Sequence, residues 1–272
     1  EVKRNIIEEA ESLLQEEVVR YQAKKNEPRF PFPEPREYQN KAYVSWVENK
    51  QQGMFAMATG TGKTITALNC LLNLYKAYHY YKAIIVVPTI SLVDQWESEC
   101  KSFNFTSIIK VYSKSDWEEA VTNLSIREKV SSPDRVSYII ITTYASYSRP
   151  KVFNELNKLS HKALFIADEA HNMGYPQVLA KLNSIRQLRR IGLSATPDRQ
   201  FDAEGNKQIN AFFNIEEKYT FEYPMHEAIR NGVLCKYFYY PHLVYLTEDE
   251  MDEYSKLSNQ LATDYNVSKD KL

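Results

Sequence analysis

Six short apolar runs, rich in β-branched residues, recur along the chain and predict the strands of a sheet. They occupy residues 54–58, 83–87, 107–111, 138–142, 164–167 and 190–193. Between them, apolar residues at helical spacing predict helices at 64–75, 91–101 and 177–188, the last with Pro176 in its first turn. Continuously apolar strands that alternate with helices are typical of a parallel sheet covered on both faces. We therefore expect an α/β fold whose ligand lies beyond the carboxyl ends of the strands.

The two ends of the chain depart from this alternation. Apolar residues recur at helical spacing within residues 6–21, and four prolines follow, so residues 1–35 are expected to be an amphipathic helix and a proline-rich connector. Near the other end, Thr247 and Glu250 have the spacing of a capping box. The helix predicted after them carries an apolar stripe, formed by Met251, Tyr254, Leu257 and Leu261. The sequence thus predicts a lobe at 36–246 between two appendages, 1–35 and 247–272.

Charge and cysteine content narrow the possible settings. The chain has 34 Lys and Arg against 35 Asp and Glu, so any contact with nucleic acid must be local. Cys70, Cys100 and Cys235 are odd in number and lack C-x-x-C spacing, which argues against a disulfide framework or a zinc site. No apolar run reaches the ~18–20 residues of a membrane span. A reducing, cytoplasmic setting without a membrane partner is expected.

A glycine-rich segment between a predicted strand and a predicted helix is the first candidate site. It runs Thr59-Gly60-Thr61-Gly62-Lys63-Thr64. Small residues there allow backbone N–H groups and the helix N-terminus to face a triphosphate, Lys63 to reach the β- and γ-phosphates, and the Thr64 hydroxyl to bind Mg²⁺. Met57 stands where the general pattern has a glycine, so a simple glycine turn that caps a helix is the alternative.

The second candidate site follows the apolar run at 164–167, where Asp168 and Glu169 are adjacent. Two carboxylates at the end of a buried strand are costly without a cation, and Mg²⁺ shared with Thr64 would supply one. Asp168 would then hold the metal through water, while Glu169 would orient and deprotonate the attacking water. The alternative is an acidic helix N-terminus, and His171 by itself is better explained as a structural histidine.

A third element, Ser194-Ala195-Thr196-Pro197, also ends a predicted strand. Ser194 and Thr196 alone are compatible with ordinary loop chemistry. The three elements occur in the order expected of an ATPase, each at the correct kind of strand end. Together they predict a phosphate-loop ATPase that uses ATP and Mg²⁺.

With these motifs, residues 36–246 resemble the N-terminal RecA-like lobe of superfamily 2 helicases and translocases. The similarity is to the DEAH-bearing branch, which includes the motor subunits of type I and type III restriction enzymes. It implies a RecA-like sheet, single- or double-stranded DNA as partner more than RNA, and a second RecA-like lobe whose arginines complete the ATP site. No segment here resembles that second lobe or a nuclease, so the helix at 247–272 is expected to lead to a lobe outside the sequence.

The resemblance also implies roles for individual residues. Gln39 would read adenine, with support from Arg36 and Tyr38. His171, Ser194 and Thr196 would link the nucleotide to the strand-binding side. The residues implied in contacts with the sugar-phosphate backbone are Pro88 and Thr89, in a segment that continues to Trp96, and Thr142 or Thr143.

Three functions remain compatible with the sequence. The first is the ATP-binding half of an ATP-dependent helicase or translocase, poorly active in isolation, which hydrolyses ATP by in-line attack of water. The second is an ATP-gated nucleic-acid docking module of a restriction or defence complex, without strand separation. The third is a phosphate-loop ATPase that acts on no nucleic acid.

Overall fold

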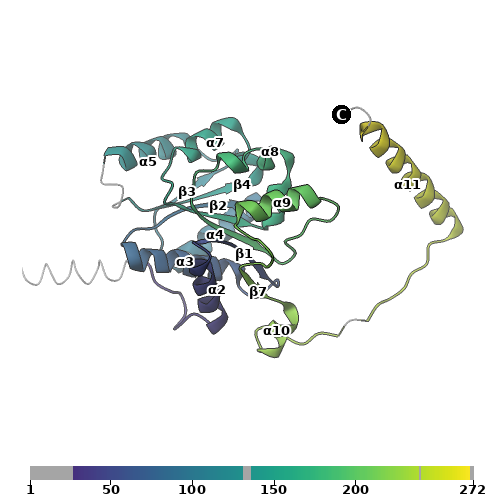
Figure 1. Cartoon of the computed structure of the whole chain (residues 1–272), viewed down its shortest axis with the longest axis horizontal. Coiled ribbons are helices and arrows are strands. Elements are labelled where there is room, and N and C mark those ends of the chain that lie inside the picture. Colours follow the sequence, from purple (N-terminus) through teal and green to yellow (C-terminus); the bar gives the residue numbers. More distant parts are fainter. Residues whose placement is uncertain (1–26, 131–135, 239, 270–272) are drawn as a thin grey trace, which may run out of the picture. The chain divides into compact units, whose positions relative to one another are not determined.

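In the computed structural model, which describes residues 27–130, 136–238 and 240–269, seven strands form one sheet (Figure 1). The strands are β1 (Gln52–Met57), β2 (Lys82–Val87), β3 (Ile108–Val111), β4 (Tyr138–Thr143), β5 (Leu164–Asp168), β6 (Arg189–Ser194) and β7 (Phe221–Tyr223). Their order is β3-β4-β2-β5-β6-β1-β7, and every paired neighbour is parallel. The α/β fold with a parallel sheet is confirmed. The amphipathic helix predicted within residues 6–21 lies outside the described residues.

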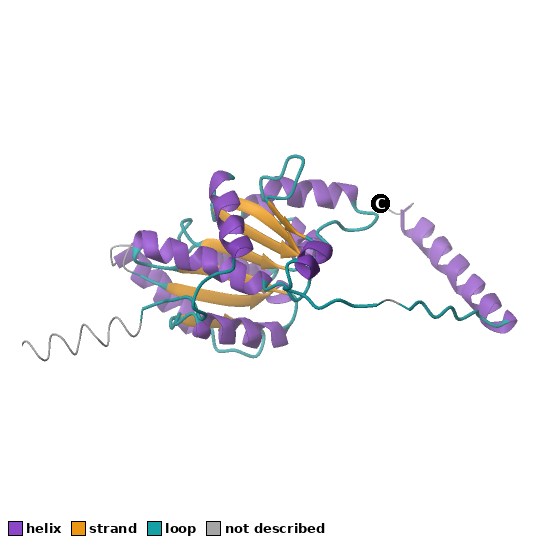
Figure 2. Cartoon of the chain, turned by 90° about the horizontal axis from the view of Figure 1, so that it is seen from below, coloured by secondary structure: helices purple, strands orange, loops and turns teal. Residues whose placement is uncertain are grey.

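Helices cover both faces of the sheet, as expected (Figure 2). The α-helices are α2 (Glu37–Glu48), α3 (Lys63–Tyr78), α4 (Ile90–Ser102), α5 (Glu118–Val130), α6 (Tyr144–Tyr147), α7 (Pro150–Asn157), α8 (Pro176–Leu179), α9 (Ala203–Phe212), α10 (Met225–Arg230) and α11 (Glu248–Lys269). Two 3₁₀ turns, η2 (Ala170–Gly174) and η3 (Leu182–Ser184), lie between β5 and β6. Helices α2, α3 and α4 share one apolar core, while α5, α7 and α9 share the other.

Strand β1 illustrates why the predicted strands are apolar throughout. Phe55 and Met57 enter the core beneath α2 and α3, whereas Met54 enters the core on the opposite face. Because successive side chains of a strand point to opposite faces, a sheet covered on both faces buries every position. All three side chains are fully buried.

The helix predicted over residues 177–188 is wrong in its extent. The chain forms only α8 and the short turn η3 there. Val178, Leu182 and Ile185 are buried, so the apolar spacing is real. However, the Asn157 side chain donates to Ser184 O and accepts from the Arg186 N–H, and these bonds draw the backbone toward α7 instead of continuing the helix.

The strand β7 and the helix α2 are among the elements that the sequence analysis did not predict. β7 has three residues and pairs only with β1, so it is too short to show a period in the sequence. Helix α2 begins at Glu37, directly after the predicted connector, in a part of the lobe for which the sequence predicted no element. The described part of that connector packs on the lobe, since the Phe30 ring lies 5.3 Å from the Phe103 ring in an edge-to-face arrangement.

The chain divides into two compact units, the first ending at Leu234 and the second comprising Cys235–Leu272. The compact unit that holds the sheet ends at Leu234, whereas the predicted lobe extends to residue 246. The capping box before α11 is present, because the Thr247 N–H donates to Glu250 Oε2 at 2.8 Å and the Glu250 N–H donates to Thr247 Oγ1 at 3.4 Å. In the described part of the chain, no helix is both long and apolar enough to cross a membrane.

Candidate functional site

The three motifs meet at the carboxyl edge of the central strands. Strand β6 lies between β1 and β5, and each of these strands ends in one of the motifs. The register pairs Asp168 with Leu193 and Ala56 with Ser194. The glycine-rich loop after β1, the carboxylates after β5 and the serine at the end of β6 are therefore neighbours.

Left-handed backbone at two glycines shapes the loop between β1 and α3. Gly60 has φ +83° and Gly62 has φ +80°, values that favour glycine. Gly62 is also the N-cap of α3 and has no side chain, so no side-chain oxygen occupies the first N–H groups of the helix. Thr59 and Gly60 are exposed, and Lys63 and Thr64 are half-buried. This loop presents N–H groups, a lysine and a hydroxyl together, as an anion site requires.

Hydrogen bonds from Tyr38 and Thr61 hold this loop in place. The Thr61 hydroxyl donates to Ala58 O at 2.7 Å, and the Tyr38 hydroxyl donates to Thr61 O at 2.6 Å. The Tyr38 ring stacks on Tyr223 of β7, with 4.2 Å between ring centroids. Tyr38 was expected to support base reading, and it lines the cavity beside α2 while its contacts also hold the loop.

The Asp168 carboxylate is buried and held in one orientation. Trp96 Nε1 of α4 donates to Asp168 Oδ2 at 2.8 Å, and the Glu169 N–H donates to Oδ1 at 3.1 Å. Burial raises the pKa of Asp168 above its ordinary value; the Trp96 hydrogen bond opposes this, the Glu169 charge adds to it and the Lys63 charge opposes it. The Tyr144 hydroxyl, at the end of β4, donates to Asp168 O at 2.9 Å.

Glu169 stands at the centre of the site. Its backbone has φ +46°, an unusual value for a residue with a side chain, and its carboxylate lies 3.7 Å from Lys63 Nζ. Ser194 Oγ lies 3.5 Å from Glu169 Oε2 and 3.2 Å from His171 Nδ1. The Thr196 N–H donates to Ser194 Oγ at 3.1 Å, and the Thr196 side chain is exposed. The structure thus brings together the residues of all three motifs.

A cavity of about 380 Å³ adjoins the glycine-rich loop on the side of α2. Gln39 and Arg36 line it together with Gly60, Thr61 and Gly62. Gln39 Oε1 accepts from the Arg36 N–H at 2.9 Å, which orients the amide. Phe30 and Phe32 also line this cavity and were not predicted, although two aromatic residues in a proline-rich segment were a visible signal.

The residues implied in strand contacts differ widely in exposure. Thr89 is exposed as the N-cap of α4, and Pro88 beside it is half-buried. The Thr142 side chain is fully buried, and its hydroxyl donates to Val111 O at 2.7 Å. In this structure the hydroxyl is therefore not accessible to a nucleic-acid strand. Thr143 is 5% exposed and bonds to Ser146 at the start of α6. Of the threonines implied, only Thr89 presents its side chain to solvent.

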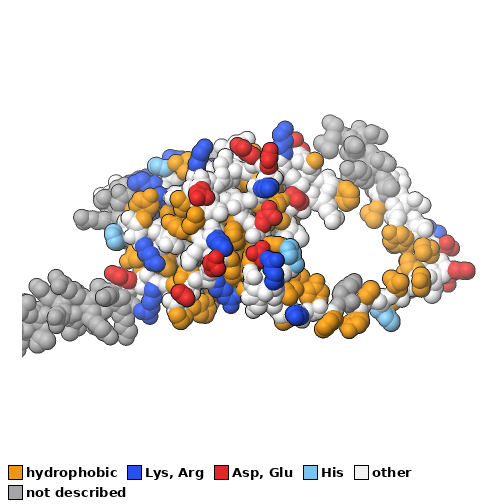
Figure 3. All heavy atoms as spheres, turned by 60° about the horizontal axis from the view of Figure 1, so that its bottom comes forward, with side chains coloured by type: hydrophobic (Ala, Val, Ile, Leu, Met, Phe, Trp, Pro, Cys, Tyr) orange, Lys and Arg blue, Asp and Glu red, His pale blue; other side chains and the backbone are white. Residues whose placement is uncertain are grey.

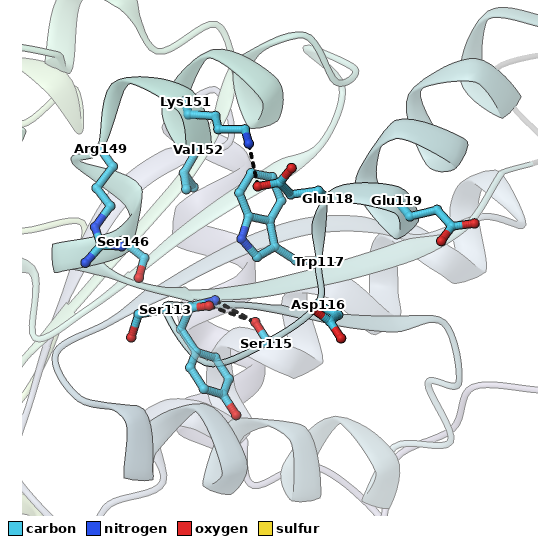
Figure 4. Close-up of a pocket in the computed structure, with 11 residues that line it drawn as sticks. Ser113, Ser115, Asp116, Trp117, Glu118, Glu119, Ser146, Arg149, Lys151 and Val152 are labelled. Atoms are coloured by element: carbon cyan, nitrogen blue, oxygen red, sulfur yellow. Dashed lines mark hydrogen bonds and ion pairs between the residues drawn. The ribbon is translucent and has the colours of Figure 1, made fainter.

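A larger cavity, of about 560 Å³, lies beyond the ends of β3 and β4 (Figure 4). Its charged lining consists of Asp116, Glu118, Glu119, Arg149 and Lys151. The carboxylates outnumber the cations, and Lys151 is paired with Glu118. Such a lining disfavours phosphate groups. On the face drawn in Figure 3, acidic and basic side chains are likewise interspersed, in keeping with the balanced charge of the sequence.

The sequence is also similar to those of known proteins. The family model described as "Type III restriction enzyme, res subunit" matches residues 32–199. The chain is 29% identical to "DNA 3'-5' translocase XPB2" of Sulfurisphaera tokodaii over 179 residues, which cover 62% of this chain and 34% of that protein. It is 24% identical to "Type I restriction enzyme EcoAI endonuclease subunit" of Escherichia coli over 213 residues, which cover 75% of this chain and 23% of that protein.

A solved structure supports the fold. It is a nuclease-deletion mutant of the type ISP restriction-modification enzyme LlaGI in complex with a DNA substrate mimic, with a TM-score of 0.56, 21% identity and coverage of 74% of this chain and 21% of that one. The sheet is therefore RecA-like, as expected. The chain spans about a third of the first relative and about a quarter of the second.

Proposed function

The chain belongs to the type III restriction enzyme res-subunit family and is a motor lobe of the superfamily 2 helicase type; from this premise, we propose that it binds Mg-ATP and hydrolyses it to drive movement on DNA. One observation carries the proposal. Lys63, Glu169 and Ser194 follow three neighbouring strands, and the Glu169 carboxylate lies 3.7 Å from Lys63 Nζ and 3.5 Å from Ser194 Oγ, with Asp168 next to it in the chain. Each of these residues has a distinct task in phosphoryl transfer.

The side chains present fit Mg²⁺ shared with a nucleotide. Among the described residues no cation lies within ion-pair distance of the buried Asp168 carboxylate, and no group of three or more His, Cys, Asp and Glu forms a metal cage. Mg²⁺ typically binds through one or two carboxylates plus substrate phosphates, which fits Asp168 and the Thr64 hydroxyl. When bound, the ion would neutralise charge that develops on the phosphates.

The protein's own groups account for the remaining steps. The N–H groups of the glycine-rich loop and Lys63 would hold the β- and γ-phosphates. Glu169 would accept the proton of the water that attacks the γ-phosphate in line. Ser194, in contact with both Glu169 and His171, would keep the base aimed at that water.

Replacing Lys63 by Ala tests the nucleotide site. The expected result is a loss of ATP affinity of at least about tenfold, because a half-buried charged hydrogen bond to phosphate is removed. Titration calorimetry measures it directly. Lys76→Ala is the matched control, since Lys76 is an exposed lysine in the last turn of the same helix. Equal ATP affinity in folded Lys63→Ala and Lys76→Ala would refute the assignment.

Base selection by Gln39 is tested by comparing nucleotides. Gln39→Ala is expected to reduce the preference for ATP over GTP by about tenfold while affinity for inorganic triphosphate stays unchanged, because only the amide can pair with both a donor and an acceptor of adenine. Gln39→Glu separates this effect from helix capping, since it keeps the oxygen that accepts from the Arg36 N–H. Parallel losses for ATP and GTP would show that Gln39 does not read the base.

A further inference from the structure

Arg199, just beyond the third motif, joins two loops of the site. Its Nη1 donates to His171 O in η2 at 2.9 Å, and its Nε donates to Asp202 Oδ2 at 2.7 Å. The guanidinium carbon lies 5.8 Å from the centroid of the Tyr175 ring. One side chain therefore contacts the segment that carries His171 at two points, and none of the predicted roles includes it.

The Arg199 side chain packs against the backbone of Gly174. A Cβ atom at Gly174 would lie 2.4 Å from Arg199 Nε and 2.5 Å from its Cδ and Cζ. Gly174 does not have a left-handed backbone, so its lack of a side chain serves this close approach. The guanidinium thus lies directly against the end of η2.

Arg199 is itself anchored to a packed helix. Its backbone N–H donates to Asn206 Oδ1 and its carbonyl accepts from Asn206 Nδ2, both at 2.9 Å. Asp202, which pairs with the guanidinium, caps α9 by accepting from the Gly205 N–H at 2.9 Å. Helix α9 is fixed in the core by Ile209 and Phe212. The backbone of Arg199 is therefore fixed to helix α9, and its side chain extends from there to η2.

The segment that Arg199 holds needs such support. Glu169 has a left-handed backbone, and η2 is a short 3₁₀ turn, which is a weak element by itself. The His171 ring meets Ser194 Oγ at 3.2 Å, while the His171 carbonyl is bound by Arg199. Fixing that carbonyl fixes where the ring and the preceding Glu169 lie. A misplacement of about 1 Å at a reacting centre costs about 100-fold in rate.

Arg199 also lies near residues that are expected to contact a nucleic-acid strand. Tyr175 is 49% exposed, and it lines a cavity of about 230 Å³ together with Pro88, one of the residues implied in strand contacts. The guanidinium therefore bridges Tyr175 and the His171 carbonyl. A contact that shifts Tyr175 would act on η2 through Arg199.

We propose that Arg199 is a positioning residue that holds η2 against the Ser194–Asp202 loop, so that Glu169 and His171 are aligned for hydrolysis and respond to nucleic acid. This inference rests on the proposed function. It assigns no contact between Arg199 and the nucleotide. It therefore predicts an effect on turnover and on its stimulation by DNA, with ATP binding preserved.

The test uses the full-length protein that the gene encodes. Arg199→Ala is expected to lower kcat by at least about tenfold and to reduce stimulation by single-stranded DNA, while KM for ATP stays within about threefold. Arg199→Lys should restore part of the loss, because an ammonium can reach one acceptor but lacks the planar fork that meets both. Arg186→Ala is the matched control, since Arg186 is exposed and its guanidinium donates to Asn157 O at 3.5 Å, away from the candidate site.

A second variant keeps Arg199 but fills the space next to Gly174 into which its side chain packs. Gly174→Ala should displace the guanidinium and reproduce the fall in kcat, and the double variant Gly174→Ala/Arg199→Ala should be no slower than either alone, because both break one contact. Multiplied losses in the double variant, or an unchanged kcat and DNA response in folded Arg199→Ala, would overturn the inference. If ATP binding is lost in Lys63→Ala while Arg199→Ala is normal, the proposed function stands and only this inference fails. A wild-type protein that does not hydrolyse ATP overturns both.

Discussion

Replacement of Glu169 by Gln is expected to leave ATP binding intact and to lower the rate of ATP hydrolysis at least about 100-fold, the usual loss when a general base is removed. The amide has the shape of the carboxylate and can still bond to Ser194. It cannot accept the proton of the attacking water. Calorimetry for binding and single-turnover hydrolysis of radiolabelled ATP, both on the full-length protein, separate the two effects.

The neighbouring carboxylate is the less suitable base. Both oxygens of Asp168 accept hydrogen bonds, from Trp96 and from the Glu169 N–H, and its side chain is buried. The Glu169 side chain is 32% exposed, so its carboxylate is accessible to solvent. Exposed Glu119 on α5 provides the control Glu119→Gln, which should turn over normally. A turnover by Glu169→Gln close to that of Glu119→Gln would place the base elsewhere.

The sequence was sufficient to predict that the three motifs meet at one edge of the sheet, because that information is local. Each motif follows an apolar strand, and parallel strands end at one edge, so Lys63, Asp168 and Ser194 could be expected near one another without coordinates. Gly60 and Gly62 could be recognised from the sequence as part of a phosphate loop, and in the structure both have the left-handed backbone that favours glycine. These inferences need only the order of residues along one strand and one turn.

Contacts between distant segments could not be predicted in this way. Trp96 and Asp168 are 72 positions apart, and their hydrogen bond depends on how α4 packs against the sheet. The two threonines at the end of β4 show the same limit. Thr142 faces the interior and bonds to Val111 O, which follows from its place in the strand next to β3. Thr143 is buried as well and bonds to Ser146, and the partner that each hydroxyl meets depends on register, which a two-residue motif does not specify.

The second large effect concerns the rate of the chain by itself. We expect residues 1–272 to bind ATP but to hydrolyse it about 10³–10⁵-fold more slowly than the longest polypeptide that the gene encodes, because an arginine supplied by another domain is worth that much in related phosphoryl transfer. Two arginines of the site have other tasks. Arg36 bonds to Tyr38 at the cavity beside α2, and Arg199 is bound to Asp202 and the His171 carbonyl. The chain also spans only about a third of the translocase that it resembles.

DNA binding should be weak for the same reason. The lobe offers mixed charges on the face of Figure 3 and a cavity near β3 and β4 that is rich in carboxylates, so few phosphates can be neutralised. Affinity should therefore depend only weakly on salt, because few counterions are released. The measurement compares ATPase rates of both polypeptides, with and without single-stranded DNA at equal salt, and Lys63→Ala of each reports contaminating activity. If residues 1–272 match the longer polypeptide in DNA-stimulated turnover, every group needed for hydrolysis lies within this lobe, and the arginine must be sought among its own residues.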